Sequence, residues 1–467
     1  MKYVNRAASI LALAATLSFP ACNKQFDKRP AVAQEDNSAA LNLAAGKPNI
    51  VLIIGDDVGR EMPTYNGGES YSTPNLDMMA SGGMQFPYFF SHPDGPPSRI
   101  AMVTGRYNFR NWVELGVLAD TEKTFGNLLK NAGYATCFTG KWQFDGGDAG
   151  IKNHGFDKYR VFMPYDPKNP LGDGNGQFYH RYKNPNLYEY GHYMSAAEVN
   201  GKYSEDMFYD YASNFIDSNA SKPFFLVYSF NLVQKPWVPT PDDAAFANWN
   251  PDTDDTDPSK YNRDYMPSMV NYLDKNIGKL INKVQSKGLM GNTIFLFVSD
   301  NATNKSITSM YKGHPVTGSK DSTTFNAINV PFVVYAPGIV AAGKTDTSLV
   351  DMTDFFPTFA DIAGSSTSSW LPLDGKSFYD NMLGTPVKSK QRSYVYCYWY
   401  RDYQQKPNVS YILDYTYKLY DSVNGSLFYN YKADPYELSP LKNRQLTPDE
   451  KKLKNKYSKL LIQIPQS

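Results

Sequence analysis

The sequence predicts an α/β fold built on a mainly parallel sheet flanked by helices. Two observations carry this prediction. Short apolar runs, of the length of buried central strands, alternate along the chain with longer segments of helical periodicity. Several of these runs end directly in polar residues, as expected where such a sheet binds ligands. From about residue 370 the pattern changes, which predicts a smaller C-terminal antiparallel α+β subdomain.

Each element is expected from its own local pattern. The apolar runs that predict strands of the main sheet are 49–54, 135–139, 224–230, 293–299 and 331–335. The helical patterns are 121–132, 265–288 and 351–363, the last closed by Gly364. In the C-terminal part, 393–400 and 409–420 are each predicted as a strand, and Thr447 with Pro448 is predicted to begin a final helix.

The N-terminus predicts export. Lys2 and Arg6 precede an apolar segment, 7–19, which ends in Pro20-Ala21-Cys22. This pattern is typical of a bacterial lipoprotein signal, with Cys22 as the acylated residue and the only membrane attachment; a cleaved secretory signal that happens to contain cysteine is the alternative. Either predicts a periplasmic or outer-membrane location. The expected divisions are signal peptide 1–22, linker 23–46, main domain 47–369 and C-terminal subdomain 370–467.

Composition excludes some functions. The chain has 467 residues, with 47 basic and 46 acidic residues, so its formal charge is +1. That balance argues against nucleic-acid binding. Three cysteines cannot build a disulfide framework. Tyrosine is abundant, and ten of the 36 tyrosines fall in 156–211, which is expected to be an insertion with few regular elements over the binding edge of the sheet. The oligomeric state is left open.

Acidic pairs follow two of the predicted strands. Asp56-Asp57 comes after the first apolar run, and Asp300-Asn301 comes after the run 293–299. One aspartate at such a place can cap the next helix. Two separate pairs directly after apolar strands point instead to a shared ligand site at the carboxyl edge of the sheet.

Together these residues resemble the sulfatase family of the alkaline phosphatase superfamily, from Lys47 to about Lys442. The resemblance rests on an ordered series of motifs: Pro48-Asn49-Ile50 through Asp56-Asp57, Thr73-Pro74-Asn75-Leu76-Asp77, Pro97-Ser98-Arg99 with Thr104-Gly105-Arg106, Gly140-Lys141-Trp142, Ser299-Asp300-Asn301, Gly318-Ser319-Lys320 with Val330-Pro331, and 427–441. It implies an alkaline-phosphatase-like sheet and a sulfuric ester hydrolase ancestry. The implied partner is a sulfate ester, on a carbohydrate or another small molecule.

The resemblance also implies roles for individual residues. The implied metal ligands are Asp56, Asp57, Asp300 and Asn301. Three carboxylates and an amide favour Ca²⁺, or Mg²⁺, over Zn²⁺, because no cysteine or histidine joins them. The implied cations around the sulfate are Arg99, Lys141 and Lys320. Donors of this kind are most useful where negative charge develops.

The chain departs from the family pattern at the nucleophile. The position of the formylglycine precursor, a cysteine or serine two residues before Pro97, is Gly95. Gln143 stands where histidine usually follows Gly-Lys-Trp, and Gln234 stands where a histidine usually contacts the sulfate. An amide cannot transfer a proton as histidine does. His314, six residues before Lys320, is the histidine expected to lie nearest the site.

These departures predict an exported sulfatase-like protein that binds a sulfate ester with impaired catalysis. An active hydrolase of sulfuric or phosphoric esters, using metal-bound water, Asp94 or His314, is the first alternative. In a second alternative, the metal only stabilises the fold, and the tyrosine-rich segment binds a partner protein or polysaccharide. In the last, Gly95 is a sporadic or engineered change in an ordinary sulfatase.

Overall fold

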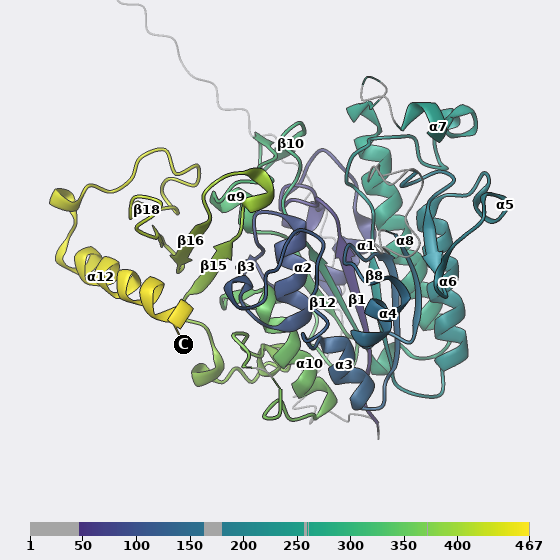
Figure 1. Cartoon of the computed structure of the whole chain (residues 1–467), viewed down its shortest axis with the longest axis horizontal. Helices are drawn as coiled ribbons and strands as arrows, with labels where there is room; N and C mark the ends of the chain where they lie inside the picture. Colours follow the sequence, from purple (N-terminus) through teal and green to yellow (C-terminus); the bar gives the residue numbers. More distant parts are fainter. Residues whose placement is uncertain (1–45, 163–179, 256–258, 260, 371, 467) are drawn as a thin grey trace, which may run out of the picture. The chain divides into compact units, whose positions relative to one another are not determined.

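A ten-stranded mixed sheet organises the chain (Figure 1), in a computed structural model that describes residues 46–162, 180–255, 259, 261–370 and 372–466. The strand order is β13-β2-β12-β9-β1-β8-β4-β5-β6-β7. The strands are β1 Asn49–Gly55, β2 Met84–Gln85, β4 Ala135–Lys141, β5 Lys158–Phe162, β6 Leu187–Glu189, β7 His192–Tyr193, β8 Phe224–Ser229, β9 Thr293–Ser299, β12 Phe332–Tyr335 and β13 Lys344–Thr345.

The centre of the sheet is parallel, as predicted. β1 pairs in parallel with β8 and β9, and β4 pairs in parallel with β8 and β5. The last of the five predicted runs, β12, is antiparallel to β9, and β6 and β7 add antiparallel pairs at the other edge. The central strands are buried along their whole length, which explains their nearly continuous apolar sequences.

Helices cover both faces of the sheet (Figure 1). On one face, Val51 and Ile53 of β1 belong to a core shared with α1 (Pro74–Gly82), α6 (Ser204–Asn219) and α8 (Met266–Ser286). This arrangement follows from the alternation of side chains along a strand, which sends every second residue of β1 to the same side.

The opposite face of the sheet is covered by α2 (Gly95–Thr104), α3 (Phe125–Asn131) and α10 (Phe355–Ala363). Phe225 of β8 meets Phe125 and Phe359 there, with ring centroids 5.4 and 5.5 Å apart. Helix α3 begins four residues later than the pattern 121–132 suggested, because the Thr124 side chain accepts the first free backbone N–H groups. Gly364 ends α10 in the left-handed conformation, as expected.

The remaining elements are short or C-terminal. They are β3 Phe89–Phe90, β10 Thr308–Tyr311, β11 His314–Thr317, β14 Val350–Asp351, β15 Val395–Trp399, β16 Val409–Leu413, β17 Tyr417–Tyr420, β18 Phe428–Asn430, α4 Gly147–Asn153, α5 Ala196–Val199, α7 Pro251–Asp254, α9 Phe325–Ile328, α11 Tyr379–Met382 and α12 Pro448–Gln463. No helix among the described residues is long and apolar enough to cross a membrane.

The C-terminal part contains the predicted antiparallel sheet, in the order β15-β16-β17-β18, with α12 packed on it. The single strand predicted for 409–420 is wrong, because Asp414 accepts hydrogen bonds from the N–H groups of Thr416 and Tyr417 and turns the chain into a hairpin. Helix α12 begins as predicted, with a capping box between Thr447 and Glu450.

The tyrosine-rich segment 156–211 is more regular than predicted. It supplies β5, β6, β7 and α5, so it extends the sheet. Tyr159, Tyr182, Tyr188 and Tyr203 are buried there as part of the core. Residues 163–179 of this segment lie outside the described residues, as do the expected signal peptide and all but the last residue of the expected linker. The domain boundaries stay predictions.

Candidate functional site

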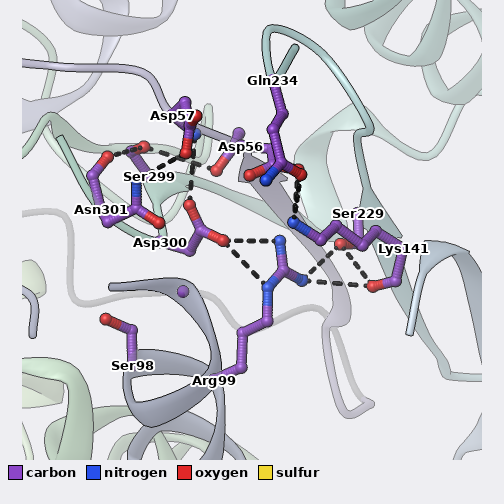
Figure 2. A network of polar contacts seen from close by, with 12 residues as sticks. Asp56, Asp57, Ser98, Arg99, Lys141, Ser229, Gln234, Ser299, Asp300 and Asn301 are labelled. Carbon is purple, nitrogen blue, oxygen red and sulfur yellow. Dashed lines mark hydrogen bonds and ion pairs between the residues drawn. The ribbon is translucent and has the colours of Figure 1, made fainter. Parts of the chain in front are cut away.

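Carboxylates from two neighbouring strands meet at the carboxyl edge of the sheet. Gly55 of β1 lies directly opposite Ser299 of β9, so the residues after each strand emerge side by side. One oxygen from each of Asp56, Asp57 and Asp300 lies within 4.8 Å of the others, and all three side chains are buried (Figure 2). The structure thus brings together the acidic pairs that the sequence placed more than 240 residues apart.

Several oxygens in this cluster have no hydrogen-bond donor among the residues that the structure describes. They are Asp56 Oδ1, Asp57 Oδ2 and Asn301 Oδ1, each buried. A buried carboxylate oxygen without a partner is costly. Oxygen donors of this kind are the ligands that Ca²⁺ and Mg²⁺ prefer. The predicted ligand set therefore fits a hard divalent cation.

Each predicted cation contacts one carboxylate of the cluster, and Figure 2 shows Arg99 and Lys141 beside it. Lys141 Nζ lies 2.6 Å from Asp56 Oδ2, and Lys320 Nζ lies 2.6 Å from Asp57 Oδ1. Arg99 Nε donates to Asp300 Oδ2 at 3.0 Å. These contacts alternate the signs of the charges across the site, which lowers the cost of burying them.

Arg99 is held mainly by the chain itself. Its Nη1 donates to Ser229 Oγ at 2.7 Å and to the backbone oxygen of Lys141 at 3.2 Å, and only 2% of its side chain is exposed. It joins the first turns of α2 to the ends of β4 and β8. Arg99 thus ties Asp300 to the ends of these two strands, whereas Lys141 and Lys320 each bring an ammonium group to the cluster.

Burial and charge shift the protonation of these groups in different directions. Burial lowers the pKa of Lys141 to about 8, although Asp56 acts the other way. Burial also disfavours the charge on Lys320, but Asp57 and the neighbouring carboxylates raise the pKa of that amine above its usual range. Burial raises the pKa of Asp300 to about 6 against the effect of Arg99. The cluster thus holds charges that a bound cation would stabilise.

Position 95 faces the carboxylate cluster. Gly95 is the first residue of α2, and its N–H donates to the side chain of Asp94 at 2.8 Å. A Cβ atom at this position would lie 2.7 Å from Asp300 Oδ2 and 3.2 Å from Asn301 Oδ1. Any side chain would therefore point at the predicted metal ligands and require Asp300 to shift. Glycine supplies no side-chain atom that could react at this position.

Nearby polar residues do not take over that place. Ser98 Oγ donates to the backbone oxygen of Asp94 at 2.9 Å and accepts from the N–H of His92, so it stabilises the start of α2. Burial lowers the pKa of His92 to about 3, which keeps its ring neutral. His314 lies exposed on the β10–β11 hairpin, and it has no contact with the described site residues. The structure does not bring His314 into the site.

The two glutamines differ in their surroundings. Gln234 Oε1 accepts from Lys141 Nζ at 2.8 Å and from Arg181 Nη1 at 2.6 Å (Figure 2 shows Gln234 beside Lys141). Gln143 follows β4 with a positive φ of 64°, half-buried, and its Oε1 has no partner among the described residues. Arg181 was missed by the sequence analysis, because it belongs to no motif and lies in the segment interpreted as an insertion.

The fold and the site together define an α/β protein with a buried acidic cluster that could hold a metal ion, and comparison with known proteins names the family. The sulfatase family matches residues 48–365, and the C-terminal region of N-sulphoglucosamine sulphohydrolase matches residues 322–464. The chain belongs to the sulfatase family. Its alkaline-phosphatase-like fold class is confirmed.

Individual relatives are sulfatases of carbohydrates by name. N-acetylgalactosamine-6-sulfatase of Mus musculus is 29% identical over 391 residues, which cover 74% of this chain and 69% of that protein. N-acetylglucosamine-6-O-sulfatase of Bacteroides thetaiotaomicron is 23% identical over 505 residues, which cover 86% of this chain and 85% of that protein. The solved structure of Ps i-CgsB in complex with k-i-k-neocarrahexaose superposes with a TM-score of 0.70 at 25% identity, covering 88% of this chain and 92% of that one.

Proposed function

We propose that this protein binds a sulfate ester of a carbohydrate at a divalent-cation site and does not hydrolyse it by the covalent route of its family. The observation that carries this proposal is position 95. Its missing Cβ would lie 2.7 Å from Asp300 Oδ2, so the residue stands beside the predicted metal ligands without any atom that can attack sulfur. The carbohydrate class is supported by the relatives, whose names specify sulfated amino sugars.

The residues of the site have separate tasks in this proposal. Asp56, Asp57, Asp300 and Asn301 would hold Ca²⁺ or Mg²⁺, which supplies positive charge for a sulfate group. Lys141 and Lys320 donate to sulfate oxygens. Only 2% of the Lys141 side chain and 12% of the Lys320 side chain are exposed, and a charge-assisted hydrogen bond is stronger in such surroundings than at the surface.

The N-terminal signal extends the proposal to location. We infer that the protein is exported and anchored through a lipid on Cys22, in the periplasm or at the outer membrane of a bacterium. Ligands would then be sulfated glycans that reach the cell surface.

The decisive experiment restores the missing nucleophile. Gly95→Cys is produced with and without a formylglycine-generating enzyme, and sulfate release is measured from monosulfated N-acetylhexosamines and sulfated polysaccharides. We expect sulfate release only from Gly95→Cys produced with the formylglycine-generating enzyme. In a serine protease, loss of the covalent nucleophile lowers turnover by about 10⁶-fold. Gly95→Ala is the control for the steric effect of a Cβ beside Asp300.

Binding by the unchanged protein completes this test. We expect a sulfated sugar to bind, as measured by isothermal titration calorimetry. We also expect the sugar to be recovered with its sulfate group intact. Sulfate release by the unchanged protein that disappears in Asp300→Ala would refute impaired catalysis and favour the metal-bound-water alternative. Absence of binding to any sulfated sugar would refute the proposal as a whole.

A further inference from the structure

Two buried cations converge on one oxygen that the chain itself supplies. Lys141 Nζ and Arg181 Nη1 lie 2.8 and 2.6 Å from Gln234 Oε1. Lys141 ends β4, Arg181 lies a few residues before β6, and Gln234 follows β8 in sequence. The contact thus joins three separate parts of the chain at the edge of the carboxylate cluster.

The charge of Arg181 is only partly compensated. Its side chain is 8% exposed, and its guanidinium carbon lies 5.1 Å from the ring centroid of Phe162. Asp56 Oδ2 is 3.6 Å away, beyond hydrogen-bond distance, and Arg181 Nε has no partner among the described residues. A guanidinium carries five N–H donors, so a buried one with a single neutral acceptor retains capacity for an anion.

The balance of charge around the cluster points the same way. The three carboxylates Asp56, Asp57 and Asp300 face four cations, which are Arg99, Lys141, Arg181 and Lys320. A fourth carboxylate, Asp94, lies 3.8 Å from Lys320, so the charges of the site balance before any metal is bound and become positive once a divalent cation is added. Like charges held together in a buried site favour the binding of an anion.

We propose that Lys141 and Arg181 form an oxyanion subsite for the sulfate group of the ligand, and that Gln234 fills this subsite with its amide oxygen until the ligand displaces it. The inference rests on the proposed function and adds a specificity-determining residue, Arg181, to it. Gln234 is then an internal competitor of the ligand. The family resemblance would instead make Gln234 a contact to the sulfate.

A neutral amide suits this role. Its oxygen accepts from both cations but carries no net charge, whereas a sulfate oxygen adds the Coulomb attraction of an ion pair to the same hydrogen bonds. A sulfate oxygen therefore replaces the amide oxygen at little cost, and the two cations are never left without an acceptor. This keeps the subsite preformed in the free protein.

The test measures affinity of the Ca²⁺-loaded full chain for N-acetylgalactosamine 6-sulfate and for inorganic sulfate by calorimetry. We expect Arg181→Gln to weaken binding by about 10- to 100-fold, as for loss of a hydrogen bond to a charged group. Arg160→Gln is the matched control, since Arg160 of β5 lies nearby in sequence but pairs with Glu189. We expect its affinity to be unchanged.

Substitutions of Gln234 distinguish the two roles by sign. Gln234→Ala removes the competitor, so we expect binding to tighten, by roughly 3- to 10-fold. Weaker binding would show that Gln234 contacts the ligand and would overturn the inference. Gln234→Glu places a fixed negative charge between Lys141 and Arg181, and we expect it to abolish binding of both probes.

A ligand-free measurement separates this inference from the proposed function. Because Gln234→Glu supplies the missing anion, we expect it to raise the melting temperature of the protein without ligand. A raised melting temperature with no binding of any sulfated sugar to the unchanged protein would refute the proposed function and leave the oxyanion subsite standing. A lowered melting temperature would overturn the subsite itself.

Discussion

At the scale of single residues, the site is defined as much by atoms that lack partners as by contacts. Asp57 illustrates both, because Lys320 and Asn301 share its Oδ1 while its buried Oδ2 has no donor in the part of the chain that the structure describes. Asp56, in the same cluster, likewise has a buried oxygen, Oδ1, without a donor among the described residues. A bound cation explains this pattern, since it satisfies oxygens that no N–H or O–H reaches.

Removal of the metal should therefore destabilise the protein. After dialysis against a chelator, we expect added Ca²⁺ to raise the melting temperature. At a hundredfold excess over its Kd, Ca²⁺ should stabilise the folded state by about 2.7 kcal/mol. Asp57→Asn should lose most of this shift, as followed by differential scanning fluorimetry. The control Asp242→Asn changes an exposed aspartate paired with Lys275. Equal shifts in the two variants would contradict the assignment of Asp57 as a ligand.

At the scale of elements, helix α6 supports the segment that carries Gln234. Glu205, in its first turn, accepts from the N–H of Asn231 at 2.9 Å, and Tyr228 of β8 donates to the backbone oxygen of Glu205. Burial raises the pKa of Glu205 to about 8, although the Asn231 N–H acts in the opposite direction. The folded protein therefore holds a proton on Glu205 at a pH where the unfolded chain releases it.

This proton makes stability depend on pH. A carboxyl with a raised pKa in the folded state loses stability as pH rises from its unfolded value, 4.5, towards 8. We expect the free energy of unfolding, measured with urea, to fall over this range. Glu205→Gln should reduce the dependence, because its amide is neutral throughout, while Asp300, whose pKa burial raises to about 6, keeps its own part. The exposed Glu114→Gln should keep it; identical pH profiles for both variants would contradict the argument.

At the scale of the whole molecule, the C-terminal sheet supports the loop that carries Lys320. Tyr420 of β17 shares a 2.6 Å hydrogen bond with the hydroxyl of Thr323 and donates to Glu437. Lys418 of the same strand donates to the backbone oxygen of Thr323. The loop is thus fixed by residues about a hundred positions further along the chain.

Loosening this support should affect both stability and affinity. Tyr420→Phe removes buried hydrogen bonds and leaves Glu437 with one donor fewer, so we expect a loss of about 1–3 kcal/mol in the free energy of unfolding. The affinity for a sulfated sugar should fall as well, because Lys320 is less well held. Tyr436→Phe, at a tyrosine that is 53% exposed, should change neither quantity. If Tyr420→Phe changed stability and affinity no more than Tyr436→Phe does, the supporting role of the C-terminal sheet would be contradicted.

The sequence by itself determined the central strands and the acidic pairs at their ends. Apolar runs and the polar residues that follow them are local patterns, so Asp56 and Asp300 were found without knowledge of the fold. The hairpin at Asp414 was not predicted from the sequence, because the alternation of apolar and polar side chains continues through the turn. The segment 156–211 was predicted to be irregular, although its Tyr159, Tyr182, Tyr188 and Tyr203 pack in the core.

Only the tertiary structure decided which side chains complete the site. Arg181 and Gln234 are 53 residues apart and meet because β8, β4 and β5 lie side by side in the sheet. His314, close to Lys320 in sequence, instead lies on an exposed hairpin. The physical reason is that a strand end specifies the chemistry available locally, whereas the pairing of strands specifies which distant charges share one buried space.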